Sequence, residues 1–192
     1  DLIDVGRNDL VARYVGWTAK TVKAKFAEAK GSVLFIDEAY SLLDDRKGSF
    51  GDEAINTIVQ EMENAREDTI VIFAGYPNEI EYFLSRNPGL NSRIAYHINF
   101  PDYNEEELFE IVRLMLQEQN LKLDPDAIPR VKSIIGSGCK QENFGNGRYV
   151  RNILDKAKMK QASRLAATAP AAITKENIQM LIWDDFEMKK KK

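Results

Sequence analysis

Two adjacent carboxylates at the end of an apolar run are the first feature of this sequence that suits chemistry. Asp37 and Glu38 follow the run Ser32–Ile36, which is typical of a strand covered on both faces. Open α/β sheets bind ligands at the carboxyl ends of their strands. Asp37 can hold a magnesium ion through water, and Glu38 can polarise a water for attack on a terminal phosphate. A buried strand that ends in a solvated acidic turn explains the run equally well on its own.

Polar side chains later in the sequence favour the chemical interpretation. A second apolar run, residues 69–74, is followed by Tyr76 and Asn78, from which a polar group can reach the same water. Arg93 stands just before a third predicted strand, and Arg148 stands at the start of a predicted helix. A guanidinium group stabilises negative charge on a transferring phosphoryl group. One arginine in each of two domains suits a site built at domain and subunit boundaries.

The predicted elements change character near residue 101. Up to that point strands alternate with helices, and beyond it only helices are predicted. Strands are expected at residues 2–5, 32–36, 69–74 and 95–100, and helices at residues 18–29, 52–65, 79–85, 104–115, 126–135, 148–167 and 174–183. Thr18 is expected to cap the first helix, and Asn104 with Glu107 forms a capping-box pattern. The pattern predicts a parallel α/β domain (1–102), a small helical domain (103–188) and a basic tail (189–192).

Composition excludes several classes of partner. The chain has 192 residues and a net charge of −3, with acidic and basic residues interleaved, so we expect no nucleic-acid partner. The run Lys189–Lys192 is interpreted as a frayed, solvated end. The single cysteine, Cys139, forms no internal disulfide and indicates a reducing compartment. With no apolar run of membrane-spanning length and no signal peptide, we expect no membrane partner. His97, the one histidine, is expected to be a packed or an edge-strand residue of the strand at 95–100.

Short motifs are spread over almost the whole chain, at Asp9–Gly16, Phe35–Leu42, Phe73–Tyr76, Asn87–Arg93, Phe100–Tyr103 and Asn146–Asn152. This series of motifs resembles the AAA+ ATPases, and more narrowly the branch that holds the red-type Rubisco activase CbbX and stage V sporulation protein K. The order and spacing of the motifs make the resemblance specific. The resemblance implies a P-loop-NTPase-like parallel sheet with helices on both faces, followed by an all-helical lid.

The resemblance also implies roles for single residues. Asp37 is similar to the magnesium-coordinating Walker B aspartate, and Glu38 to the catalytic glutamate. Arg93 resembles the arginine finger, which acts on ATP held by the neighbouring subunit. Arg148 resembles the second sensor arginine of the lid, with Arg151 one turn further on as an alternative.

Two further roles come from the same resemblance. Tyr14, Val15 and Gly16 resemble the aromatic pore loop that grips a polypeptide in the central channel of a ring. A hydrophobic anchor in the core is the alternative for Tyr14, but the adjacent glycine and polar neighbours favour an exposed loop. The first sensor position corresponds to Tyr76, with Asn78 two residues on as the other candidate.

One part of the family pattern is missing from this sequence. The phosphate-binding loop, Gly-x-x-x-x-Gly-Lys-Ser/Thr (Walker A), has no match, and Gly145–Arg148 lacks the lysine. The strand that leads into that loop, the central one of the family's sheet, is also missing. A sheet without its middle strand leaves unpaired edges. We therefore expect this chain to be part of a longer protein.

Three hypotheses follow. In the first, the parent protein is a ring-forming ATPase, a hexamer that uses ATP and Mg²⁺ to remodel a protein substrate in the cytoplasm or a plastid stroma. In the second, the chain is a protein-binding or assembly module that does not hydrolyse ATP. In the third, another chain supplies the missing strand by domain swapping. Rubisco and a sporulation factor both remain open as the substrate.

Overall fold

The computed structural model describes residues 1–12, 14, 16–43, 50–141, 144–169 and 172–187. Val15, most of the charged, glycine-containing segment at residues 43–51 and the lysine tail therefore lie outside the described residues. The chain divides into two compact units, with the boundary between Asn99 and Phe100. In the described part of the chain, no helix combines the length and apolar character that crossing a membrane requires.

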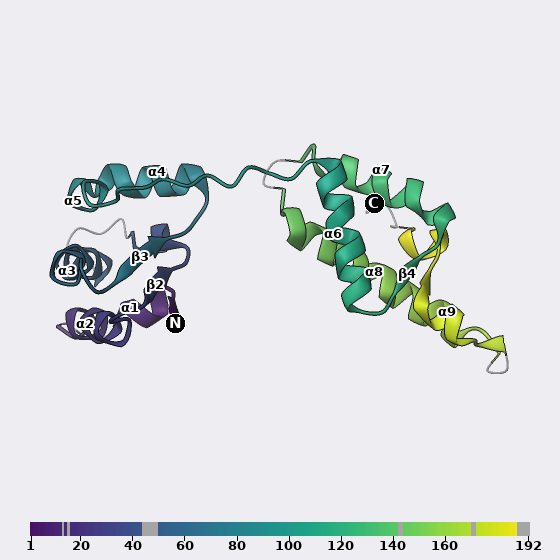
Figure 1. Cartoon of the computed structure of the whole chain (residues 1–192), viewed down its shortest axis with the longest axis horizontal. Coiled ribbons are helices and arrows are strands. Elements are labelled where there is room, and N and C mark those ends of the chain that lie inside the picture. Colours follow the sequence, from purple (N-terminus) through teal and green to yellow (C-terminus); the bar gives the residue numbers. More distant parts are fainter. Residues whose placement is uncertain (13, 15, 44–49, 142–143, 170–171, 188–192) are drawn as a thin grey trace. The chain divides into compact units, whose positions relative to one another are not determined.

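The first unit is built on a small parallel sheet. Its strands are β1 (Leu2–Val5), β2 (Val33–Ile36) and β3 (Ile70–Phe73), hydrogen-bonded in the order β1-β2-β3 (Figure 1). Leu2 pairs with Val33, and Val33 pairs with Ile70, so the three strands run in register. The predicted parallel α/β architecture is confirmed, and its three carboxyl ends share one edge.

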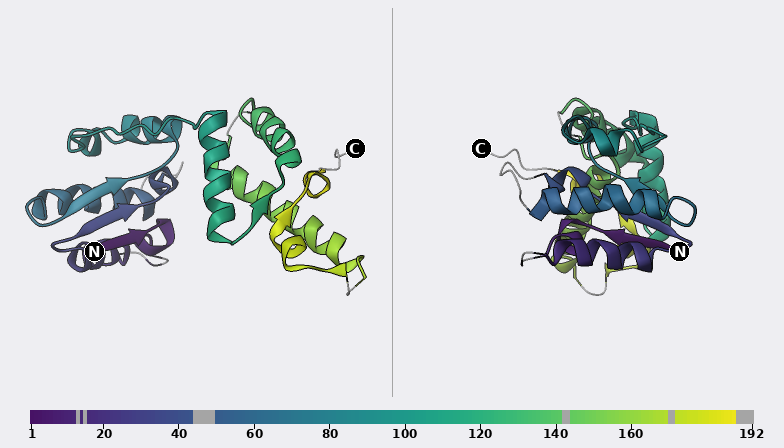
Figure 2. Two further views of the ribbon diagram at one scale, coloured as in Figure 1. Left: turned by 45° about the vertical axis from the view of Figure 1, so that its right-hand side comes forward. Right: turned by 90° about the vertical axis from the view of Figure 1, so that its left-hand side faces the viewer.

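Helices connect these strands, and Figure 2 shows α2 and α3 side by side. The helices of this unit are α1 (Arg7–Leu10), α2 (Thr18–Glu28), the 3-10 helix η1 (Ala39–Leu42), α3 (Phe50–Asn64), α4 (Pro77–Arg86) and α5 (Pro88–Asn91). Val22 and Phe26 of α2, with Ile55 and Ile58 of α3, join Leu34 in one buried cluster. Burial of this apolar face, at roughly 25 cal/mol per Å², holds α2 and α3 together on the sheet.

Exposure alternates along β2 and β3. This differs from the sequence-based prediction that residues 32–36 form a strand covered on both faces. Leu34 and Ile36 of β2 are fully buried. Ile70 and Ile72 of β3 remain 64% and 41% exposed. Because alternate strand residues point to opposite faces, one face of this sheet is packed under helices and the other is open at β3.

The strand predicted over residues 95–100 does not form. The structure gives this segment no regular secondary structure, and Tyr96, Ile98 and Phe100 are each more than three-quarters exposed. The prediction that His97 is a packed or an edge-strand residue is wrong for the same reason, because no strand forms there and His97 is exposed. A strand exists only through its ladder hydrogen bonds, and in the described part of the chain none of the three strands pairs with this segment.

The second unit is mainly helical, which confirms the predicted lid. Its helices are α6 (Glu105–Glu118), the 3-10 helix η2 (Pro125–Ala127), α7 (Ile128–Gly138), α8 (Asn146–Ala166), α9 (Lys175–Gln179) and the 3-10 helix η4 (Trp183–Phe186). The structure adds a parallel pair of two-residue strands, β4 (Lys122–Leu123) and β5 (Met180–Leu181). The helix expected at residues 174–183 therefore ends at Gln179, where the chain enters β5.

Side-chain hydrogen bonds stabilise both ends of this unit. The predicted capping box of α6 is confirmed, because Asn104 Oδ1 accepts from the N–H groups of Glu106 and Glu107, and Glu107 accepts from the N–H of Asn104. At the other end, Arg164 of α8 donates two hydrogen bonds to Asp185, which is only 1% exposed. This pair ties the C-terminal segment to α8.

Candidate functional site

Asp37 and Glu38 leave β2 at the carboxyl edge of the sheet, and both are exposed. The N–H of Asp37 donates to the carbonyl of Val5 at 3.0 Å, which continues the ladder, and Asp37 Oδ1 accepts from the N–H of Glu38 at 2.9 Å. Glu38 adopts φ 46° and ψ 46°, the left-handed region. A non-glycine residue there costs about 1–3 kcal/mol, and such strain is concentrated at functional sites. The left-handed turn leads the chain from β2 into η1.

The turn after β3 packs closely against η1. A Cβ added to Gly75 would lie 2.7 Å from Cε1 of Tyr40, so only glycine fits at this approach. The Tyr40 ring also lies 6.4 Å from the ring of Tyr76, measured between centroids. Burial raises the pKa of the Tyr40 phenol, with a smaller contribution from the negative charge of Glu38. The segments that carry the carboxylates and the predicted first sensor are thus in direct contact.

Both first-sensor candidates lie at the start of α4. Tyr76 is the N-cap residue, with an extended backbone, and Asn78 is in the first turn. Both side chains are exposed. The N–H of Ala39 donates to the carbonyl of Ala74 at 3.0 Å, so the two strand ends are hydrogen-bonded just below these residues. The sheet therefore brings the two carboxylates and the two sensor candidates to one edge.

Arg93 follows α5 and is held by two contacts. Its NH1 group donates to the carbonyl of Gly89 at 2.9 Å, and its Nε lies 3.4 Å from Oε2 of Glu63 on α3. The side chain is 35% exposed. No pattern in the sequence singled out Glu63, since it is one of several polar residues on the solvent side of α3. These contacts orient the guanidinium and leave part of it open to solvent.

Tyr14 and Trp17 are both exposed, as the loop prediction expected for Tyr14. Tyr14 is 70% exposed and makes an edge-on contact with Trp17, at 6.3 Å between ring centroids. Gly16 between them adopts φ 76°, which favours glycine. The expected cap by Thr18 is wrong: Trp17 takes the N-cap position, and the buried Thr18 hydroxyl accepts from the N–H of Ala12 at 3.2 Å. Thr18 thus anchors the turn rather than the helix end.

Arg148 and Arg151 lie in the first turns of α8, in the second unit, and both are exposed. Because the two units are described separately, these arginines are not placed relative to Asp37. Asn146, two residues before Arg148, opens the motif Asn146–Asn152, and nothing in the sequence indicates its role. Its side chain makes hydrogen bonds to Asp102 and Tyr103 at the start of this unit.

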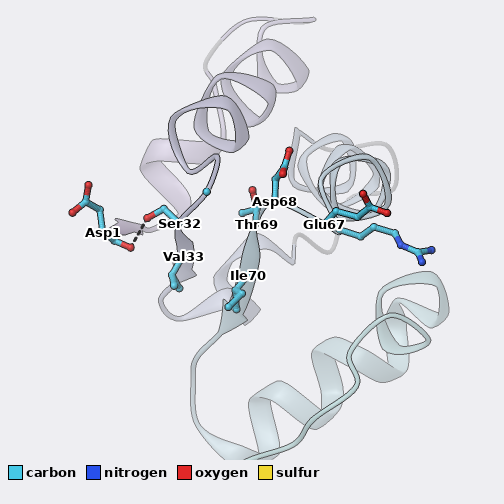
Figure 3. Close-up of a pocket in the computed structure, with 9 residues that line it drawn as sticks. Asp1, Ser32, Val33, Glu67, Asp68, Thr69 and Ile70 are labelled. Carbon is cyan, nitrogen blue, oxygen red and sulfur yellow. Dashed lines mark hydrogen bonds between the residues drawn. The ribbon is translucent and has the colours of Figure 1, made fainter.

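A shallow depression of the first unit lies away from this edge. It has a volume of about 450 Å³ and is lined by residues at the amino ends of β2 and β3, among them Asp1, Ser32, Asp68 and Thr69 (Figure 3). The hydroxyl of Ser32 donates to the carbonyl of Asp1 there. The carboxylates of Asp37 and Glu38 leave the opposite edge of the same strands, so this depression is not part of the candidate site.

The donor set at the carboxyl edge fits a magnesium ion bound together with a phosphate ligand. Mg²⁺ keeps several waters and takes only one or two protein carboxylates plus substrate phosphates. Asp37 presents one exposed carboxylate beside that of Glu38. Among the described residues, no group of three or more His, Cys, Asp or Glu side chains forms a self-sufficient metal site. Asp37 is therefore the residue that would hold the ion.

Comparisons with known proteins agree with this geometry. The profile of the ATPase family associated with various cellular activities (AAA) matches residues 1–102, and that of the AAA lid domain matches residues 104–192. Protein CbbX from Cereibacter sphaeroides is 44% identical over 186 residues, 96% of this chain and 60% of the relative. A CfxQ homolog from Cyanidium caldarium is 45% identical over 96% of this chain and 65% of the relative.

A third relative is the chloroplastic ribulose bisphosphate carboxylase/oxygenase activase of Cyanidioschyzon merolae, 45% identical over 96% of this chain and 64% of the relative. This chain thus spans somewhat less than two-thirds of the length of these relatives. The AAA match covers more than half of the chain, and the lid match follows it directly. The chain therefore belongs to the AAA family of ATPases.

Proposed function

We propose that this chain carries the hydrolysis and lid elements of a ring-forming ATPase that remodels other proteins. The observation that carries this proposal is the exposed pair Asp37–Glu38 at the carboxyl edge of a parallel sheet, with Glu38 in a left-handed turn. Open α/β sheets bind ligands at this edge. The strained backbone is maintained at a residue that has no packing role.

The two carboxylates take different parts in the proposed reaction. Asp37 would hold Mg²⁺, which supplies charge neutralisation at the phosphates of bound ATP. Glu38 orients and polarises the attacking water. Tyr76 or Asn78, at the start of α4, takes the first sensor position beside that water. The contact between Tyr40 and Gly75 supports this arrangement, because it locks the two strand ends that carry these groups together.

Arginines complete the proposed site. Arg93 acts as the arginine finger on ATP held by the neighbouring subunit of the ring, which we propose to be a hexamer. Its orientation by Gly89 and Glu63 supports this role, since the guanidinium is fixed yet partly open to solvent. Arg148 of α8 acts as the second sensor, with Arg151 as the alternative. Guanidinium groups suit this work because they stay charged and match phosphate geometry.

The exposed turn at Tyr14 is proposed to grip a protein substrate. Tyr14 and Gly16 flank Val15, which lies outside the described residues, and the aromatic side chain projects from a turn anchored by Thr18. An exposed aromatic residue on an anchored turn suits contact with a passing polypeptide. One relative is by name an activase of ribulose bisphosphate carboxylase/oxygenase, so that enzyme is the first substrate to test. We propose a cytoplasmic or plastid stromal location, because that relative is chloroplastic.

Replacing Glu38 by glutamine in the protein as its gene encodes it tests the hydrolytic role. Glu38→Gln should keep ATP binding and lower turnover by about a hundredfold or more, because the water loses its base. Glu81→Gln, an exposed residue on α4, is the matched control and should leave both unchanged. Unchanged turnover in Glu38→Gln would contradict the assignment.

Nucleotide binding separates this proposal from the non-hydrolysing assembly module. A fluorescent ATP analogue with magnesium is titrated against residues 1–192 and against the protein as its gene encodes it. The proposal predicts binding by the latter, with loss of the signal when unlabelled ATP competes. The assembly-module hypothesis predicts that neither binds the analogue.

A further inference from the structure

The side chain of Asn146 joins two segments of the helical unit that lie far apart in the sequence. Its Nδ2 donates to Oδ1 of Asp102 at 2.7 Å, and its Oδ1 accepts from the backbone N–H of Tyr103 at 3.0 Å. Nδ2 also lies 3.4 Å from the carbonyl oxygen of Phe144. One amide therefore uses both its donor and its acceptor to fasten the entry segment of this unit, Phe100–Asn104, to the first turn of α8.

The backbone around Asn146 is an unusual turn flanked by glycines. Asn146 adopts φ 46°, a left-handed conformation that asparagine tolerates better than most residues. Gly145 and Gly147 flank it, and a Cβ added to Gly147 would meet nothing within 4 Å. Neighbouring glycines supply no side-chain contacts of their own. Among the described residues, the amide of Asn146 supplies the side-chain hydrogen bonds between this turn and the entry segment.

Arg148 lies two residues beyond Asn146, and its backbone belongs to the same turn. The N–H of Arg148 donates to the carbonyl of Gly145 at 2.9 Å, so its backbone is set by the turn that Asn146 fastens. On the other side of the turn, the ring of Tyr149 packs on Phe144 at 5.0 Å, and its hydroxyl donates to the carbonyl of Ile134. The entry segment begins directly after the boundary between the two units.

We propose that Asn146 is a positioning residue for Arg148. By holding the first turn of α8 to Asp102 and Tyr103, it couples the direction of the Arg148 guanidinium to the segment through which the chain enters the helical unit. A shift of the entry segment then moves Arg148, and a phosphate held by Arg148 restrains the entry segment. Because Arg148 acts on phosphates only in the function proposed above, the role of Asn146 rests on that function.

A swap of the two hydrogen-bonding groups tests the contact itself. Asn146→Asp keeps an acceptor for Tyr103 but places a carboxylate against that of Asp102, so affinity for a fluorescent ATP analogue should fall about tenfold. Asp102→Asn/Asn146→Asp restores one donor and one acceptor and should recover most of that loss. Asn152→Asp, an exposed site further along α8, adds the same charge as a control and should have no effect. No recovery in the double variant would overturn the proposal.

A double-mutant cycle tests whether Asn146 acts through Arg148. Asn146→Gly removes the amide and tolerates the left-handed backbone, and should weaken nucleotide binding about tenfold when Arg148 is present. With Arg148→Ala in the background, the same change should have no further effect on binding. Equal losses in both backgrounds, or a loss that only follows lowered thermal stability, would show a purely structural role and overturn the proposal.

The same experiments separate failure of this inference from failure of the function. If Arg148→Ala leaves nucleotide binding unchanged while Glu38→Gln still stops turnover, the sensor role of Arg148 and the positioning role of Asn146 are both wrong, and the ATPase assignment stands. If the protein binds and hydrolyses no ATP at all, the proposed function fails with them.

Discussion

Oε2 of Glu63 lies 3.4 Å from Nε of Arg93, although α3 and the turn after α5 are separate in the sequence. The pair is exposed, so it contributes little to stability, of the order of 0–1 kcal/mol. Its effect is to limit the directions that the guanidinium can take. The carbonyl of Gly89 restrains NH1 in the same way. The proposed finger is thus oriented within its own subunit.

Removing Glu63 should therefore affect turnover more than folding. In Glu63→Ala we expect the midpoint of urea unfolding to stay almost unchanged, and ATP turnover to fall about threefold as Arg93 loses its orientation. Glu67→Ala removes the same charge nearby and serves as the control. Equal turnover in the two variants would show that the contact does not position Arg93.

Replacing Glu38 by glycine should raise stability and abolish activity. Its left-handed backbone favours glycine, so Glu38→Gly should raise the free energy of unfolding by about 1 kcal/mol while turnover is lost. Glu81→Gly, in the interior of α4, should have the opposite sign and cost about 1 kcal/mol. Urea unfolding of both variants measures this. A Glu38→Gly protein that is less stable would contradict the account of strain.

Gly75 should not accept a side chain. A methyl group there would lie 2.7 Å from the Tyr40 ring, so Gly75→Ala should lower the free energy of unfolding by about 1–3 kcal/mol. Tyr40→Ser opens the space, and Gly75→Ala should then cost much less in the Tyr40→Ser background. Additive losses would mean that the two residues do not meet in solution.

We expect Tyr40 to contribute to the loss of stability at alkaline pH. Its pKa is raised in the folded state above its ordinary value of 10.0, so the folded form holds its proton when the unfolded chain has lost it. The stabilisation is therefore complete below pH 10 and is lost as the pH rises through the raised pKa. Tyr40→Phe should therefore flatten the fall of unfolding free energy above pH 10, and an unchanged fall in this variant would contradict the account.

The sequence predicted the structure correctly where the pattern lay within one short segment. The apolar run before Asp37 predicted β2. Because parallel strands end at one edge of a sheet, the sequence also predicted that Asp37 lies near the residues that follow β3. That run predicted cover on both faces of β2, where Leu34 and Ile36 are fully buried but Val33 and Phe35 are only partly buried. On β3, Ile70 and Ile72 are exposed. The strand predicted at residues 95–100 is also absent. A segment with a strand-like sequence becomes a strand only where another strand pairs with it.

Contacts between distant polar residues lay beyond sequence reasoning. Glu63 reaches Arg93, and Asn146 reaches Asp102, across long stretches of chain with no periodicity that marks them. Thr18 has a residue type that caps helices, yet its buried hydroxyl accepts a hydrogen bond from the N–H of Ala12 instead. In each case tertiary packing decided which of several available hydrogen bonds formed.

Mixing two inactive variants tests the central claim, that Glu38 of one subunit and Arg93 of its neighbour act on the same ATP. Glu38→Gln and Arg93→Ala, each made in the protein as its gene encodes it, should each be nearly inactive alone. Random mixed rings at equal amounts contain intact sites at roughly one interface in four. The account predicts that ATP turnover reappears on mixing and subunit exchange. Turnover that stays at the level of the separate variants would contradict it.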